Sequence, residues 1–226
     1  MTDEPRSRRE RPAKAALTRR GIVAEAVRIM RAEGMDRVTM RRLAKELDTG
    51  PASLYVYFRN TAQLHGAVLD DLLGTVDLSP VDAAGDWRER VAALLTSYMD
   101  VLFEYPSLAQ SAVTARPAGE NYLRLLEGLL ALLHEGGVPP GQAAWGIDLL
   151  LQLATATAAE HAGSDDPEQW EALTAAMRAV GPQTHPRIHA LSEDLLSGPV
   201  EDRASWGIRV LINGVLATPR TEGEPL

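Results

Sequence analysis

A short stretch of the chain combines cationic, hydroxyl and aromatic side chains at a spacing that suits contacts with nucleic acid. It runs from Thr39 to Phe58 and reads Thr-Met-Arg-Arg-Leu-Ala-Lys-Glu-Leu-Asp-Thr-Gly-Pro-Ala-Ser-Leu-Tyr-Val-Tyr-Phe. Arginine side chains bind phosphate oxygens, whereas short apolar and hydroxyl side chains contact the edges of bases. The chemistry that these residue types favour is therefore recognition of a nucleic acid.

The first part of this stretch has the pattern of a short amphipathic helix. Leu43, Ala44 and Leu47 recur at helical spacing, which predicts a helix from Thr39 to Leu47. The Thr39 hydroxyl is placed to accept a hydrogen bond from a free N–H of the first turn and so to cap this helix.

The second part predicts another helix after a tight turn. Asp48-Thr49-Gly50 interrupts the apolar pattern, and Pro51 suits the first position of a helix because no N–H is needed there. Leu54 and Phe58 are four residues apart and share one apolar face. Two short helices joined by a three-residue turn with a glycine predict a helix-turn-helix, whose second helix can enter the major groove of DNA.

These residues resemble the DNA-binding domain of the TetR family of bacterial repressors. The resemblance covers roughly Leu17 to Leu69 and is carried by Thr39-Met40-Arg41, Leu43-Ala44, Leu54-Tyr55, Tyr57-Phe58 and Leu64. The chain departs from the family pattern at four positions. It has Asp48 for the turn glycine, Gly50 for the hydroxyl residue that starts the recognition helix, Tyr57 for a histidine and Thr61 for a lysine.

The helix-turn-helix spacing and this resemblance suggest how DNA is contacted. We expect base edges to be faced by Pro51, Ala52, Ser53 and Val56. We expect phosphates to be contacted by Arg41, Tyr55, Tyr57 and Thr61. The DNA-binding surface is completed by Thr39, Arg42 and Gly50.

Charge is divided unevenly along the chain. The 226 residues carry a net charge of −8, yet residues 1–66 hold 14 Lys and Arg against 8 Asp and Glu. The remainder holds 9 against 23. A basic first third is typical of a nucleic-acid-binding domain, and the acidic remainder favours approach to DNA by the N-terminal end only. Within this third, residues 1–16 predict a basic arm, which is either a solvated tail or a phosphate or minor-groove contact.

Composition excludes several other classes of protein. The chain has no cysteine, which excludes disulfides, iron–sulfur clusters and thiol nucleophiles, and its 45% hydrophobic content argues against disorder. No apolar run is long enough to span a membrane, and the charged N-terminus does not fit a signal peptide. We therefore expect a soluble cytoplasmic protein without a membrane partner.

The periodicities predict an all-α chain with two domains. We expect a helix-turn-helix domain at 17–59, a helical ligand-binding and dimerisation domain at 60–218, and a tail at 219–226. A helix from Asn60 to Val76 is expected to join the domains, followed by a loop to Asp86. Further helices are predicted at about 87–103, 107–115, 121–135, 140–162, 170–180, 187–196 and 200–217.

The second domain is similar to the ligand-binding domain of the tetracycline-repressor branch of the same family. That similarity implies a homodimer built from a four-helix bundle, to which each subunit contributes residues 139–162 and 200–217. The drug–magnesium histidines of that branch are replaced by Asp77 and Ala112 here, so we expect a different, mostly apolar small molecule. The candidate polar lining residues are Tyr98, Gln110, Asn121 and Gln152.

Other sites are weakly supported by the sequence. His185 and His189 are four residues apart, but Pro186 and the lack of a third ligand argue against a metal site. We find no glycine-rich phosphate loop and no nucleophile elbow, so we expect no cofactor and no enzyme activity. Asp70 and Asp71 are interpreted as a solvated helix face.

The sequence thus favours a homodimeric, ligand-responsive repressor that binds double-stranded operator DNA and is released by a small-molecule inducer. One alternative is an enzyme or carrier with an incidental helix-turn-helix, which would gain nothing from a basic N-terminal third. Another is an architectural DNA protein without a ligand, which an empty, tightly packed second domain would favour.

Overall fold

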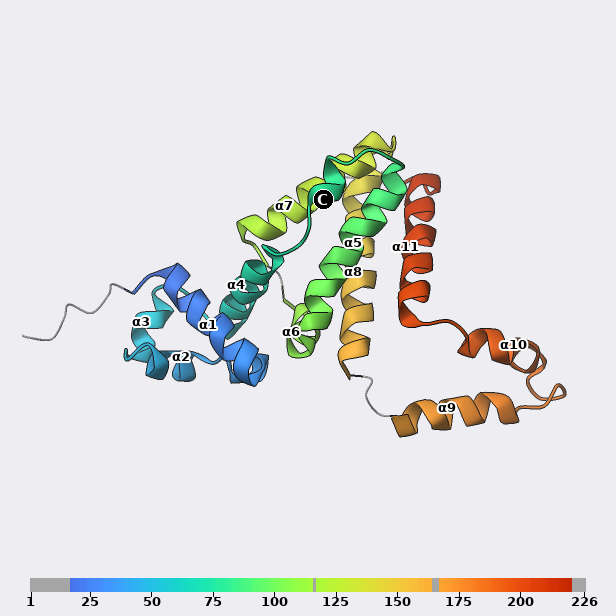
Figure 1. The fold of residues 1–226 in the computed structure, drawn as a ribbon, viewed down its shortest axis with the longest axis horizontal. Helices are drawn as coiled ribbons and strands as arrows, with labels where there is room; N and C mark the ends of the chain where they lie inside the picture. Colours follow the sequence, from blue (N-terminus) through green and yellow to red (C-terminus); the bar gives the residue numbers. More distant parts are fainter. Residues whose placement is uncertain (1–16, 116, 164–166, 221–226) are drawn as a thin grey trace, which may run out of the picture.

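The computed structural model describes residues 17–115, 117–163 and 167–220, and all regular structure in these ranges is helical (Figure 1). The predicted all-α class is therefore confirmed. The predicted arm at 1–16 and the end of the tail at 221–226 lie outside the described residues. None of the helices in the described ranges has the length and apolar character needed to cross a membrane.

A compact group of short helices, called the head here, forms one end of the molecule (Figure 1). It consists of α1 (Arg19–Glu33), the 3₁₀ turn η2 (Met35–Arg37), α2 (Met40–Glu46) and α3 (Pro51–Tyr55). The Thr18 hydroxyl caps α1 by accepting a hydrogen bond of 3.0 Å from the Gly21 N–H. The helix ends as predicted at Gly34, whose φ of 89° lies in the left-handed region that favours glycine.

Apolar side chains from each helix of the head meet in one core. Ile22 and Ile29 of α1, Leu43 of α2, and Leu54 and Phe58 at α3 are all fully buried. Each contributes about 1.5–3 kcal/mol through removal of its apolar surface from water. Because α3 has five residues and cannot be stable alone, its orientation is set by this burial of Leu54 and Phe58.

The helix α4 (Thr61–Leu73) joins the head to the rest of the chain. Asn60 caps it, with the side-chain oxygen accepting a hydrogen bond of 2.9 Å from the Gln63 N–H. It packs against α1 on one side and against α5, α6 and α7 on the other. The helix ends at Leu73 rather than Val76, and the loop predicted after it contains a 3₁₀ turn, η3 (Ser79–Val81).

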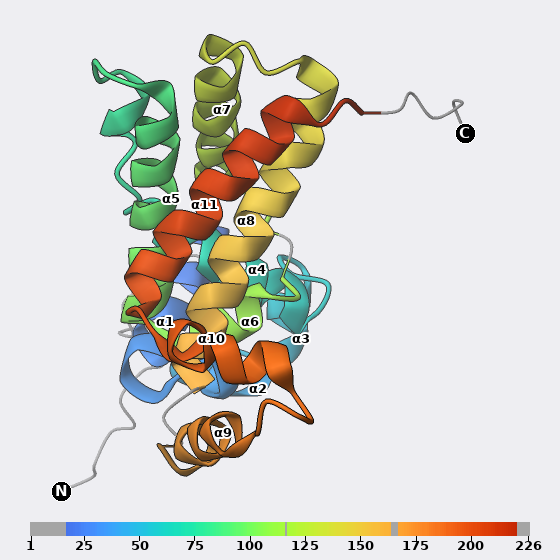
Figure 2. The same cartoon turned by 90° about the vertical axis from the view of Figure 1, so that its right-hand side faces the viewer.

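The larger part of the molecule, called the body here, is a bundle around one long helix. It comprises α5 (Trp87–Glu104), α6 (Pro106–Ala112), α7 (Glu120–Glu135), α8 (Pro140–Gly163) and α11 (Val200–Ala217). The central helix α8 packs against the other four, and α11 lies across it (Figure 2). The helix α6 ends at Ala112, before the predicted Ala115.

Two further helices project from the body on the side away from the head (Figure 1). They are α9 (Pro167–Ala179) and α10 (Pro186–Leu196), which pack against each other. Both begin slightly earlier than predicted, because each starts at a proline. The pair keeps four large apolar side chains exposed, namely Trp170, Leu173, Leu191 and Leu195.

Candidate DNA interface and ligand cavity

The outer surface of α3 is open to solvent. Pro51, Ala52 and Ser53 are exposed, and the apolar side chain of Val56 is 81% exposed. Tyr55 is 53% exposed on the same short helix. A helix that buries Leu54 inward and presents small, apolar and hydroxyl groups outward has the form of a recognition helix. The base contacts themselves stay a prediction.

The turn before α3 keeps its shape without the usual glycine. Asp48 has a φ of 47°, in the left-handed region that aspartate tolerates better than most residues. Gly50 occupies the N-cap position of α3 without a side-chain bond, and Pro51 follows at the start of the helix. Thr39 caps α2 as predicted by accepting a hydrogen bond of 3.1 Å from the Arg42 N–H.

The two arginines at the start of α2 differ in their surroundings. Arg42 Nη2 lies 2.7 Å from Glu33 Oε1, and Arg42 Nε lies 2.9 Å from Glu46 Oε1. Both carboxylates balance the charge of Arg42, and the one from Glu33 joins α2 to α1. The Arg41 side chain is exposed, so it is the one of the pair that is free to reach a phosphate.

Tyr57 has an internal contact that the sequence did not suggest. Its hydroxyl donates a hydrogen bond of 2.5 Å to the Leu17 carbonyl oxygen, and Arg19 Nη1 donates one of 3.2 Å to the Tyr57 carbonyl oxygen. The Arg19 guanidinium also lies over the Phe58 ring, 4.5 Å from its centroid. Thr61 is half-buried at the start of α4.

A cavity of about 510 Å³ lies where α4 meets the body. Its walls come from α4, α5, the end of α6, the α6–α7 connection, the start of α7 and α8. The described residues that line it are Leu69, Tyr98, Ala112, Val113, Ala115, Pro117, Tyr122, Asp148, Leu151, Gln152, Thr155 and Ala156. Most of these side chains are apolar, and the volume suits a small organic molecule.

Two polar pairs face this cavity. The hydroxyl groups of Tyr98 and Thr155 are buried and share a hydrogen bond of 2.7 Å. Burial raises the pKa of the Tyr98 phenol above its ordinary value, so the group stays neutral. On the same face of α8, Gln152 Nε2 donates a hydrogen bond of 2.5 Å to Asp148 Oδ2.

Two of the four predicted ligand residues therefore lie together. Tyr98 and Gln152 both line the 510 Å³ cavity. Gln110 is exposed on α6 and is not among the residues that line it. Asp148 and Thr155 were missed by the sequence reasoning, although their spacing of four and three residues from Gln152 puts them on the same helix face.

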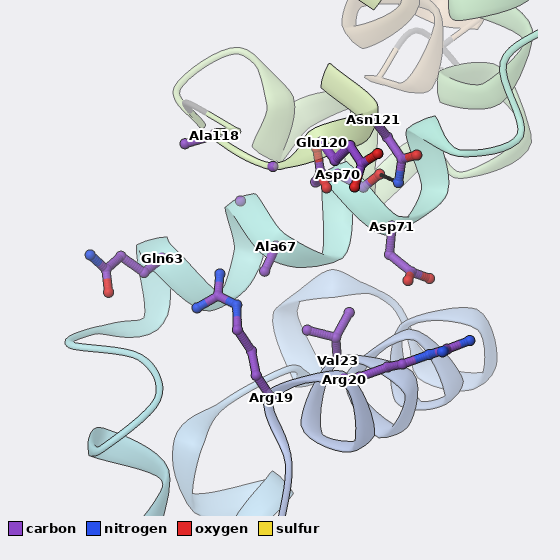
Figure 3. A pocket seen from close by; sticks show the side chains of 12 residues that line it. Arg19, Arg20, Val23, Gln63, Ala67, Asp70, Asp71, Ala118, Glu120 and Asn121 are labelled. Atoms are coloured by element: carbon purple, nitrogen blue, oxygen red, sulfur yellow. Dashed lines mark hydrogen bonds between the residues drawn. The ribbon is translucent and has the colours of Figure 1, made fainter. Parts of the chain in front are cut away.

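Asn121 lines a second cavity, a cleft of about 550 Å³ between the head and the body (Figure 3). Arg19 and Arg20 of α1 form one wall of the cleft. The start of α7 carries the carboxylate of Glu120, and α4 carries those of Asp70 and Asp71. The cleft separates α1 from the start of α7, with α4 as its floor.

Asp70 is not part of a solvated face, contrary to the prediction. Its Oδ1 accepts a hydrogen bond of 2.9 Å from the Tyr122 N–H, and its carbonyl oxygen accepts one of 2.9 Å from Asn121 Nδ2. Asp71, one residue later, is exposed as predicted. The head contacts the body directly elsewhere, where the Met35 N–H of η2 donates a hydrogen bond of 2.9 Å to Ser107 Oγ of α6.

Apolar side chains also remain exposed on the outer surfaces of α8 and α11. On α8 these are Trp145, 57% exposed, and Leu149; on α11 they are Trp206, 65% exposed, and Val210. Ile212 of α11 faces the other way and is fully buried in the core of its own chain. The sequence alone did not separate these two faces of α11.

The structure offers no support for a metal site at the histidine pair. His189 Nδ1 forms a hydrogen bond of 3.1 Å with the Val180 carbonyl oxygen, so this ring nitrogen already has a partner. Throughout the described ranges, no group of three or more His, Cys, Asp or Glu side chains comes close enough together to hold a metal ion.

A helix-turn-helix head joined by one helix to a helical body with a cavity beside that helix defines the class of DNA-binding regulators with a ligand-binding domain. Residues 22–68 match the bacterial regulatory proteins of the tetR family, and residues 79–218 match the tetracyclin repressor-like C-terminal domain. The second match covers more than half of the chain. The chain therefore belongs to the TetR family of transcriptional regulators, and the predicted likeness of its second domain to the tetracycline-repressor branch is confirmed.

Individual relatives agree with this assignment. The transcriptional repressor DrrR1 of Streptomyces coeruleorubidus is 28% identical over 232 residues, which cover 96% of this chain and 85% of DrrR1. The crystal structure of the Streptomyces protein SCO7704 is 55% identical, with a TM-score of 0.81, and the match covers 93% of this chain and all 100% of that one.

ActR of Streptomyces coelicolor is a relative solved with small molecules. Ligand-free ActR is 33% identical with a TM-score of 0.81, and the match covers 90% of this chain and 98% of ActR. Structures of ActR are known in complex with (S)-DNPA and with actinorhodin. Because the family consists of transcriptional regulators, the enzyme alternative is set aside.

Proposed function

We propose that the protein is a ligand-responsive repressor that binds a near-palindromic operator as a homodimer and is released by a small-molecule inducer. The observation that carries this proposal is the position of α4. Its first residue, Thr61, follows the recognition helix after a five-residue connection, and its Leu69 lines the 510 Å³ cavity. One helix therefore contacts both the ligand cavity and the head.

The inducer is a mostly apolar molecule with at least one oxygen atom. The described walls of the cavity are mainly apolar, and the neutral Tyr98–Thr155 pair offers both a donor and an acceptor. Ala112 presents only a methyl group where the tetracycline branch uses a metal-binding histidine, which favours a ligand other than the tetracycline–magnesium complex. Actinorhodin, which ActR binds, is a reasonable first compound to try.

The dimer forms through the outer surfaces of α8 and α11. Trp145 and Leu149 on α8, and Trp206 and Val210 on α11, expose apolar area that a second copy would remove from water. A two-fold dimer presents its two recognition helices to half-sites about one helical turn, or slightly more, apart. A DNA partner of this kind implies that the protein works in the cytoplasm.

Release follows from a difference in affinity between two arrangements of the dimer. A ligand that fits the cavity better when α4 is tilted favours that arrangement, in which the heads no longer match successive major grooves. A 100-fold difference in affinity corresponds to about 2.7 kcal/mol of coupling. Operator DNA must then weaken ligand binding by the same factor.

The test has two stages. Selection of bound fragments from a random DNA pool identifies the operator, and a near-palindromic consensus is expected. Actinorhodin is then titrated calorimetrically against the protein with and without operator. Weaker binding in the presence of operator supports the switch, whereas equal affinities would mean that a molecule bound in the cavity does not control DNA binding.

The architectural alternative predicts no such coupling. It also predicts a tightly packed body, and the cavity of about 510 Å³ argues against that. The calorimetric titration with and without operator distinguishes a ligand-responsive repressor from an architectural protein. An architectural protein would bind its DNA site equally well at every ligand concentration.

A further inference from the structure

The helix α7 begins without a cap of its own. The first N–H groups of a helix have no partner within it, and Gly119 at the N-cap position has no side chain to supply one. The acceptor comes instead from α4, since Asp70 Oδ1 accepts the hydrogen bond of 2.9 Å from the Tyr122 N–H. A carboxylate is well suited to this position because the helix N-terminus carries partial positive charge.

A second bond, also donated by α7 and accepted by α4, joins the same two helices. Asn121 Nδ2 donates a hydrogen bond of 2.9 Å to the Asp70 carbonyl oxygen. A dashed line marks this bond in Figure 3. The fit is close, because a Cβ atom at Gly119 would lie only 1.9 Å from Asp70 Oδ2. Asp70, Gly119, Asn121 and Tyr122 are called the α4–α7 joint below.

The joint separates the two cavities. The Tyr122 side chain lines the 510 Å³ ligand cavity, whereas Asp70, Gly119 and Asn121 line the 550 Å³ cleft beside α1. A molecule that displaces the Tyr122 ring thus acts on the residue whose N–H Asp70 accepts. The cleft on the other side leaves space into which α4 and the head can move.

We propose that Asp70 is a positioning residue that holds α4 at the angle required for operator binding and couples the ligand cavity to the head. The inference rests on the proposed function. Asp70 lies nine residues after Thr61, which is about 14 Å along α4, so a small tilt at the joint displaces the attached recognition helix. In a dimer that tilt changes the separation of the two heads.

The experiment measures how strictly the protein discriminates between half-site spacings. The wild-type operator is compared with versions lengthened or shortened by one base pair at the centre. Wild type is expected to prefer its own spacing by about tenfold or more. Asp70→Ala should reduce this preference to about threefold or less, because loss of the cap frees the angle of α4. A residue with only a structural role would not alter the preference of the folded protein.

Two single variants serve as matched controls. Asp70→Asn keeps an acceptor at the same position, and asparagine is a good helix cap, so its spacing preference should stay within about twofold of wild type. Asp71→Ala removes a carboxylate that is exposed on the neighbouring position and should leave the preference unchanged. A spacing preference for Asp70→Ala equal to that of wild type would overturn the proposal.

A reversible cross-link tests the same idea within one protein, by comparison of its oxidised and reduced states. The chain has no cysteine, so Asp70→Cys combined with Gly119→Cys provides one unambiguous pair. A Cβ at residue 119 would lie 2.2 Å from Asp70 Cγ, so the two side chains are in direct contact, and a small shift of the chain is needed before their sulfur atoms can bond. The oxidised protein should keep the strict preference and the reduced protein should lose it. Identical preferences in both states would contradict the proposal.

Failure of this inference can be distinguished from failure of the proposed function. If wild type selects no operator from the DNA pool, the proposed function fails and this inference with it. If wild type selects an operator but Asp70→Ala keeps the wild-type spacing preference, only the role of Asp70 fails. Amide hydrogen exchange at Tyr122 gives a readout without DNA, and Asp70→Ala should accelerate that exchange about tenfold or more.

Discussion

The Tyr57 hydroxyl donates a hydrogen bond of 2.5 Å to the carbonyl oxygen of Leu17, forty residues earlier in the chain. This bond ties the residue before the α1 cap to the end of the recognition helix. The Arg19 side chain strengthens the same contact by donating to the Tyr57 carbonyl oxygen. The position of α3 on the head therefore depends on side chains at the beginning of the described chain.

Substitution of Tyr57 by phenylalanine is expected to destabilise the protein in the absence of DNA. Loss of one hydrogen bond costs about 0.5–1.5 kcal/mol, which lowers Tm by about 2–4 °C per kcal/mol in a chain of this size. Tyr55→Phe is the control, because Tyr55 is exposed and should leave Tm unchanged. Equal Tm values for Tyr57→Phe and wild type would mean that the hydroxyl acts on DNA alone, as the sequence suggested.

Arg41 and Arg42 are expected to have different roles despite being adjacent. Arg41→Ala should weaken operator binding equally across DNA sequences and reduce the slope of log K against log salt by about one, as for one lost phosphate contact. Arg42→Ala removes ion pairs with Glu33 and Glu46 and should cost about 0–1 kcal/mol of stability with little change in slope. Reversed behaviour of the two variants in salt titrations would contradict these roles.

Val56 and Ser53 are expected to determine base preference. Val56→Ala and Ser53→Ala should each shift the consensus recovered from a random DNA pool at one position in each half-site, by about 1–3 kcal/mol of discrimination. Arg41→Ala in the same selection should return the wild-type consensus at lower affinity. An unchanged consensus for both α3 variants would show that bases are read elsewhere.

The proposed dimer surface can be tested with paired substitutions on α11. Val210→Glu places a charge on the exposed face and should give a folded monomer by sedimentation, because burying an unpaired charge in an interface is costly. Ile212→Glu, two residues later, should instead unfold the chain, since Ile212 is buried in its own core. A wild-type protein that sediments as a monomer at micromolar concentration would remove the dimer from the proposal.

Tyr98 is expected to make stability dependent on alkaline pH. Burial raises the pKa of its phenol in the folded state, so unfolded chains release that proton first as pH rises. The stabilisation is complete below the ordinary pKa of about 10 and is lost as pH rises above it. The stability advantage of wild type over Tyr98→Phe should therefore shrink between pH 9 and about pH 11 in urea unfolding, and a constant difference would argue against this burial effect.

The head was predictable because its signals are local. Thr39, Pro51 and Gly34 act on helix ends within a few residues, and Leu54 and Phe58 mark one face of a single turn. The long helices of the body were predictable for the same reason. The predicted and observed ends of these helices differ at prolines and turns, where one or two residues determine the end of a helix.

Contacts between distant residues were not predictable. Nothing near Asp70 in sequence indicates that the N–H of Tyr122, 52 residues later, needs an acceptor. The difference between Arg41 and Arg42 depends on Glu33 in another helix. The inward side of α11 was also ambiguous, because apolar residues surround most of that helix, and only its packing on α8 separates Ile212 from Val210.

The helices α9 and α10 form a connection outside the bundle that can tolerate changes in its length and sequence. It leaves the bundle after α8 and returns at α11, and α10 has no buried residue among those described. Lengthening such a connection adds little loop-closure entropy, and its loss exposes little core. Insertions, deletions and protease cleavage should therefore concentrate there in an isolated subunit, while the packing of α5, α8 and α11 continues to define a single cooperative unit.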